Sequence, residues 1–119
     1  DKRIFRITAA GSSELGEFIR SKTRPTVIRD DLLVKVASLS ESNSAEVAAA
    51  VRDRLGTSQE KLKMYESLRP ALLGELTEQQ FLASGPGRPE FGPYLALKRG
   101  IAFERGNVRW AREVLSVLE

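Results

Sequence analysis

The C-terminal stretch from Tyr94 to Glu119 carries an apolar ladder that limits the possible folds more than any other part of the chain. Its members recur at alternating spacings of four and three residues, which is the a/d pattern of a helix that packs along a seam. They are Leu97, Ile101, Glu104, Val108, Ala111, Leu115 and Leu118. The pattern predicts one long helix with a partner helix along its seam.

A second apolar row lies beside this ladder and widens the apolar face of the helix. Its members are Phe103, Trp110, Val114 and Val117. Together the two rows make roughly half of the helix circumference apolar, which is more than one neighbouring helix of a small domain covers. We therefore expect two contacts, one of them from a second copy of the chain, and assign the seven ladder residues to a homodimer interface.

Glu104 is the one ionisable member of the ladder. A carboxylate in a seam needs a cation or hydrogen-bond donors, or it stays at the wet edge. Arg99 and Arg105 are its cationic neighbours in the sequence. The sequence leaves two interpretations of a pair between Glu104 and one of these arginines: it is a polar contact that makes the dimer seam specific, or it is an ion pair on the surface.

The composition excludes several kinds of site. The chain has 119 residues, enough for one domain, and contains neither Cys nor His. Disulfides, Cys/His zinc sites, thiol nucleophiles and histidine bases are therefore absent. Asp30 and Asp31 are adjacent, so on a helix they point about 100° apart and suit a helix start better than a metal site. We expect no catalytic residue, no metal and no cofactor; a carboxylate-dependent enzyme is the alternative.

The hydropathy and the charge of the sequence indicate the cellular compartment of the protein. The longest purely apolar run is Val47 to Val51, far short of the roughly 20 residues that a membrane span needs. No signal-peptide pattern opens the chain. The formal net charge is +3, and the excess of basic residues lies before residue 25. We expect a cytoplasmic protein without membrane contact.

The N-terminal part is predicted to hold a strand and two helices. Residues 2–8 alternate cationic and apolar side chains, as a half-buried strand does. Thr8 suits a helix N-cap, and Leu15, Phe18 and Ile19 form one face of a helix to about residue 22. A second helix of about three turns is marked by Ile28, Leu32, Val36 and Leu39.

A long helical run follows. Asn43 and Glu46 have the spacing of a capping box, and an apolar stripe continues for about 30 residues, or about 45 Å of helix. Such a rod needs a long antiparallel companion. Gly56 and Pro70 interrupt it, and because proline removes a helical donor we expect a bend or break. Residues 84–93, rich in Gly and Pro, are predicted to form a loop.

Three segments resemble the PadR family of bacterial transcriptional regulators. The opening DKRIFRITAAGSSEL resembles the second wing strand and following helix of the family's winged helix. The ending GIAFERGNVRWAREVL resembles the close of its C-terminal effector domain, the virulence-activator alpha C-terminal type. Between them, Arg29, Asp30, Leu33 and Lys35 match an RDxxLxK pattern.

The resemblance implies a mainly α fold, an antiparallel long-helix, coiled-coil-like dimerisation domain at residues 25–119, preceded at residues 1–24 by a remnant winged-helix strand and helix. In that family the winged helix binds DNA, and the C-terminal helices pair two subunits and can sense a small molecule. The base-reading helix should precede Asp1, so we expect this chain to be a fragment. Lys2, Arg3 and Arg6 are the expected phosphate contacts of the intact protein.

Alternatives remain open at each site. The three N-terminal cations also suit the exposed edge of a strand. Four aromatic residues could line an effector pocket, although large aromatics at helical spacing more often belong to a core; they are Tyr65, Tyr94, Phe103 and Trp110. The competing function is a helical protein–protein interaction module with no DNA link.

Overall fold

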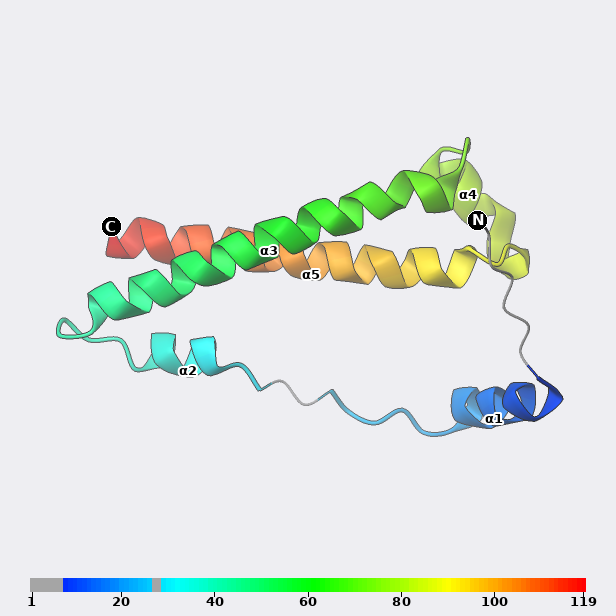
Figure 1. Ribbon diagram of the computed structural model, residues 1–119, viewed down its shortest axis with the longest axis horizontal. Coiled ribbons are helices and arrows are strands. Elements are labelled where there is room, and N and C mark those ends of the chain that lie inside the picture. Colours follow the sequence, from blue (N-terminus) through cyan, green and yellow to red (C-terminus); the bar gives the residue numbers. More distant parts are fainter. Residues whose placement is uncertain (1–7, 27–28) are drawn as a thin grey trace.

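The computed structural model describes residues 8–26 and 29–119, and these ranges are helical without a strand (Figure 1). The helices are α1 (Ala9–Arg20), α2 (Asp31–Ala37), α3 (Ser44–Leu73), α4 (Glu78–Ser84), the 3-10 helix η1 (Gly85–Gly87) and α5 (Phe91–Leu118). The prediction of a mainly α chain is confirmed. The predicted wing strand, except Thr8, and also Lys2, Arg3, Arg6 and Ile28 lie outside the described residues.

The long helices α3 and α5 run side by side in opposite directions and form a hairpin (Figure 1). The predicted seam of α5 faces this hairpin partner. Its buried members are Ile101, Glu104, Val108, Ala111 and Leu115, while Leu97 and Leu118 are half-buried. The buried side chains are covered by their own chain, so the surface for a second copy has to be sought elsewhere on α5.

The apolar core lies at the end of the hairpin where α2 joins it. Its buried members are Leu32, Val47, Ala48, Val51, Ala111 and Leu115, with Trp110, Val114 and Leu118 packed around them. Burying one large aliphatic side chain stabilises a fold by about 1.5–3 kcal/mol. Leu32 therefore ties the short helix α2 to α3 and α5.

The two N-terminal helices are shorter than predicted. Thr8 caps α1 by accepting a hydrogen bond of 3.0 Å from the Gly11 N–H, as expected, and the helix ends at Arg20. None of its residues is buried, and it lies apart from the hairpin in Figure 1. Helix α2 has 7 residues because Asp30 caps its start and Ser38 its end.

The predicted capping box at the start of α3 is wrong. Asn43 is the N-cap residue, but its side chain makes no cap hydrogen bond. It bridges the preceding turn instead, accepting from the Ser40 N–H at 2.8 Å and donating to the Ser38 carbonyl at 3.0 Å. The asparagine therefore holds the α2–α3 connection together.

The predicted break in the long helix is also wrong, because α3 continues through both Gly56 and Pro70 for 30 residues. Pro70 lies in the last turn, so it removes a hydrogen bond near an end that the helix reaches at Leu73. Gly74 then ends the helix with φ of +63°, a conformation that glycine adopts without strain.

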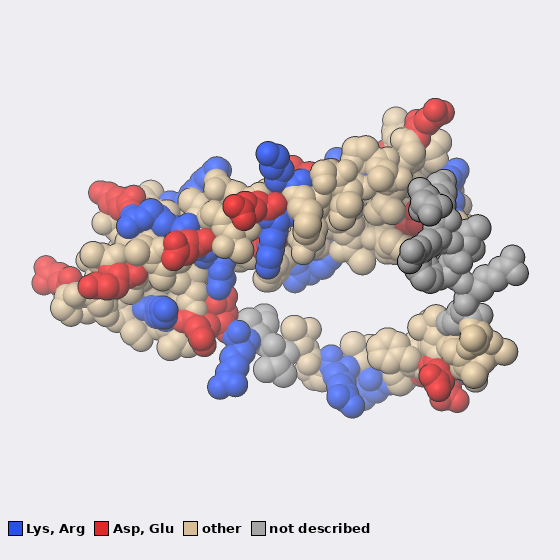
Figure 2. Space-filling model, viewed as in Figure 1, with Lys and Arg blue, Asp and Glu red and all other residues tan. Residues whose placement is uncertain are grey.

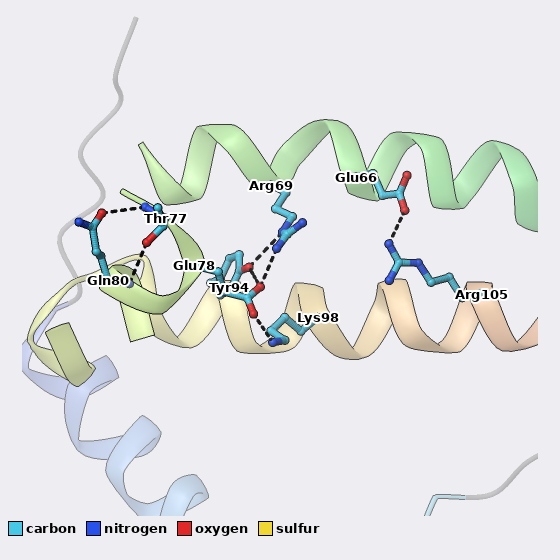
Figure 3. Close-up of polar contacts among 8 residues, drawn as sticks. All are labelled: Glu66, Arg69, Thr77, Glu78, Gln80, Tyr94, Lys98 and Arg105. Atoms are coloured by element: carbon cyan, nitrogen blue, oxygen red, sulfur yellow. Dashed lines mark hydrogen bonds and ion pairs between the residues drawn. The ribbon is translucent and has the colours of Figure 1, made fainter. Parts of the chain in front are cut away.

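Helix α4 was not predicted, although the sequence holds its start signal. Thr77 and Gln80 form a reciprocal capping box, seen in Figure 3, with bonds of 3.0 and 3.1 Å between each side chain and the other residue's N–H. The predicted loop is correspondingly short. The loop consists only of η1 and a few residues after it, because α5 begins at Phe91. Pro93 lies in the first turn of α5, where proline is tolerated.

Candidate functional site

A cavity of about 390 Å³ opens between the start of α2 and the middle of the hairpin. We call it the Glu104 cavity. It is lined by Arg29, Asp30, Arg54, Thr57, Ser58, Lys61, Phe103, Glu104 and Asn107. Three cations thus face two carboxylates around one aromatic ring, which leaves an excess of one positive charge.

Glu104 lies at the inner wall of this cavity and is only 4% exposed. Its Oε1 accepts hydrogen bonds from the Asn107 side-chain amide at 2.9 Å and from the Ser58 hydroxyl at 3.3 Å. A buried carboxylate needs such donors, because it loses its hydration on folding. Both bonds go to Oε1, so Oε2 keeps its capacity to accept from a donor in the cavity.

Neither of the two arginines next to Glu104 in the sequence, Arg99 and Arg105, pairs with it. Arg105 forms an ion pair with Glu66 at 2.9 Å, and the Arg99 guanidinium lies over the Phe103 ring, 5.2 Å from its centroid. Glu104 is stabilised by neutral donors and by the nearby charge of Arg54. The pKa of Arg54 is raised, first by its hydrogen bond to Asp30 and in smaller part by the charge of Glu104.

Arg54 connects the cavity to the start of α2. Its two terminal nitrogens donate to the two oxygens of Asp30, both at 2.8 Å, and Asp30 also accepts from the Leu32 N–H at 3.1 Å. The Arg54 bonds are the main reason that the pKa of Asp30 is lowered. Asp30 thus caps α2, in agreement with the helix-start role predicted for it, and in addition it pairs with α3.

A second polar cluster closes the other end of the hairpin, where α4 packs on it (Figure 3). Tyr94 is fully buried, donates its hydroxyl hydrogen to Glu78 and accepts from Arg69 Nε at 3.1 Å. Glu78 also pairs with Arg69 at 2.8 Å and with Lys98 at 2.9 Å. We call these four residues the Glu78 clamp; it holds α4 against α3 and α5.

The clamp predicts a specific acid sensitivity. The Tyr94 hydroxyl, followed by Lys98 and Arg69, lowers the pKa of Glu78 from 4.5 to about 2. A lowered pKa in the folded state means that this carboxylate stabilises the fold fully above pH 4.5 and that the contribution is lost as the pH falls towards 2. Glu78→Gln should therefore lower the melting temperature at pH 6 and lose less on acidification than the parent does.

The matched control is Glu75→Gln, at an exposed carboxylate three residues before Glu78. Thermal melts between pH 6 and pH 2.5 should leave its acid profile parallel to that of the parent. Identical acid profiles for Glu78→Gln and the parent would show that the clamp does not stabilise the fold.

The four aromatic residues proposed for a pocket do not lie together. Tyr94 packs against Phe81, with ring centroids 4.9 Å apart, and Trp110 packs against the core. Tyr65 covers Gly100, where a β-carbon would lie 3.3 Å from its ring. Only Phe103 lines the Glu104 cavity, because residues 94, 103 and 110 are too far apart along one helix to share a pocket of this size.

Figure 2 shows no continuous basic stripe over the hairpin on the face drawn there. Acidic and basic side chains alternate over the hairpin there instead of forming a basic stripe. Across residues 8–26 and 29–119, no cluster of acidic residues has the arrangement of a metal site. None of the helices in these ranges combines the length and hydropathy that a transmembrane segment requires.

Comparison with known proteins places this geometry in a family. Residues 28–119 match the family model described as virulence activator alpha C-term. The negative transcriptional regulator PadR of Bacillus subtilis (strain 168) is 24% identical over 120 residues, which is all of this chain and 63% of that protein. The chain thus spans less than two thirds of the length of this relative.

Two crystal structures of Bacillus subtilis PadR have a similar fold. The complex with operator DNA has a TM-score of 0.66 at 23% identity and matches 94% of this chain and 60% of that one. The complex with p-coumaric acid has a TM-score of 0.67 at 23% identity and matches 94% of this chain and 65% of that one. With the family model covering most of its length, the chain belongs to the virulence activator alpha C-terminal family of PadR-like proteins.

Proposed function

We propose that this chain is the effector-binding and dimerising part of a DNA-binding transcriptional regulator. The observation that carries the proposal is the Glu104 cavity, because a buried carboxylate, three cations and an aromatic ring meet in one hollow of a chain in this family. DNA contact by the intact protein is supported by the relative solved with operator DNA. Lys2, Arg3 and Arg6 are proposed as phosphate contacts there.

The cavity suits a small aromatic acid with a hydroxyl group, such as the p-coumaric acid bound by the solved relative. The excess positive charge favours a carboxylate. The half-exposed ring of Phe103 offers a face for a second ring to pack on. Glu104 Oε2 is an acceptor for the phenolic hydroxyl, and a hydrogen bond to a charged acceptor contributes about 1.5–3 kcal/mol.

A pair of ligands tests this site by isothermal titration calorimetry. The wild-type chain should bind p-coumaric acid about 10- to 100-fold more tightly than the same acid without its hydroxyl group. In Glu104→Gln the amide oxygen can still accept from Ser58 and Asn107, but the charged acceptor is gone, so this preference should shrink to a few-fold. A preference that survives unchanged, or no binding of either acid by the wild-type chain, would argue against the site.

The homodimer is a second part of the proposal, and its surface differs from the buried seam. On α5, Leu95, Phe103 and Val117 are exposed by 46%, 53% and 81%. Phe103 and Val117 belong to the second apolar row with the half-buried Trp110 and Val114, and Leu95 extends this row towards the start of α5. An apolar row of this length on a soluble helix is typical of a protein–protein contact.

Sedimentation equilibrium tests the dimer. The wild-type chain should sediment as a dimer at micromolar concentration, and Val117→Asp should weaken the association at least tenfold, because the new carboxylate would lose its hydration in the interface. A chain that stays monomeric at several hundred micromolar would contradict this part of the proposal and support an interaction module that works as a single copy.

A further inference from the structure

Among the described residues that precede Asp30, Arg29 is the one whose side chain lines the Glu104 cavity. Among the described residues before Asp30, the hydrogen bonds of Thr8, Gly11 and Ser21 are local ones within or next to α1. Asp30 makes the first bonds to a distant element, to Arg54 on α3. Residues 21–26 have no helix or strand and are exposed.

Arg29 therefore has an unusual position. It precedes the anchored Asp30 directly, lines the cavity, and has an exposed side chain. The other two cations of the cavity, Arg54 and Lys61, both belong to α3 and so to the hairpin. A ligand anion bound among the three would contact one group outside the hairpin and two groups within it.

We propose that Arg29 binds the anionic group of the cavity's ligand and thereby couples occupancy of the cavity to the chain that precedes α2. The inference rests on the proposed effector site. Its physical basis is charge balance: three cations face two carboxylates, one of which already holds Arg54, so a ligand carboxylate supplies the charge that draws Arg29 to the hairpin. The bidentate Asp30–Arg54 pair fixes the point from which Arg29 extends.

The coupling is tested by limited proteolysis with trypsin, scored at the bond after Lys22, which lies in the exposed stretch before α2. Arg29→Gln and Lys61→Gln are a matched pair, since each removes one cavity cation, one outside and one inside the hairpin. Each should weaken p-coumaric acid binding by about two- to fivefold, as an exposed charge pair does. Proteolysis is then run at ligand concentrations scaled to saturate each variant.

At saturation, the ligand should slow cleavage after Lys22 at least threefold in the wild-type chain and in Lys61→Gln, and should not slow it in Arg29→Gln. Equal protection of Arg29→Gln, or no protection of a saturated wild-type chain, would overturn the coupling while leaving the effector site in place. If calorimetry finds no binding by the wild-type chain, the effector site fails and the coupling fails with it.

Discussion

Val51→Asp is expected to leave the chain largely unfolded at room temperature. Val51 is 0% exposed and lies in the core between α2, α3 and α5. An aspartate there would be an ion without a partner, and an uncompensated buried charge typically costs several kcal/mol. That cost is comparable with the whole stability of a small domain. Circular dichroism and a thermal melt should show lost helix and no cooperative transition.

The control for this prediction is Ala49→Asp. Residue 49 lies on the same helix two positions earlier but is exposed, so the same new side chain should change the free energy of unfolding by only about 0.5 kcal/mol. If Val51→Asp melts like Ala49→Asp, the core is not where the structure puts it.

Phe81→Ala is the second change with a large expected effect. Phe81 is 1% exposed and packs against Tyr94 and Phe91, with ring centroids 4.9 and 5.9 Å away. Truncating a buried phenylalanine costs about 3–5 kcal/mol, because transfer energy is lost and a cavity remains. Chemical denaturation should measure this loss, and the same truncation at Phe18, which is 75% exposed, should change stability by under about 1 kcal/mol.

Phe81→Ala should also disturb the Glu78 clamp, because Phe81 holds the ring of Tyr94 beside Glu78. The acid profile of this variant should therefore resemble that of Glu78→Gln. If Phe81→Ala lowers the free energy of unfolding by only a few tenths of a kcal/mol, α4 does not pack tightly on the hairpin.

The sequence predicted the buried face of α5 but not what covers it. The a/d spacing identifies which side chains of a helix are buried, and Ile101, Val108 and Leu115 are indeed buried. The same spacing fits a helix from the same chain or from another. From the width of the apolar face we assigned these residues to a second copy, whereas α3 covers the buried ones within one copy.

The environment of Glu104 could have been predicted in part. On α3, Val51, Leu55 and Leu62 follow the seam, and Ser58 occupies the position between them. A polar residue in the seam of each helix indicates one polar layer across an antiparallel pair. The sequence alone could not fix the register of the two helices that brings Ser58 within 3.3 Å of Glu104. The connection that sets this register includes α4, which was not predicted.

The cavity itself could not be predicted, since it depends on where α2 docks. The RDxxLxK pattern includes Arg29 and Asp30, but it indicates a family resemblance and no physical role for them. Their physical role follows from the pair between Asp30 and Arg54, which are 24 residues apart in the sequence. Leu33 and Lys35 of the same pattern are exposed and lie outside the cavity.

The most direct test of the Glu104 cavity as an effector site is a titration of the 15N-labelled chain with p-coumaric acid, followed through its side-chain amide signals. The chain has two asparagines, and only Asn107 donates to Glu104 and lines the cavity; Asn43, in the α2–α3 turn, is the internal control. We expect the Asn107 amide signals to shift saturably while those of Asn43 stay in place. Saturable binding that leaves Asn107 unmoved, or no binding, would contradict the account.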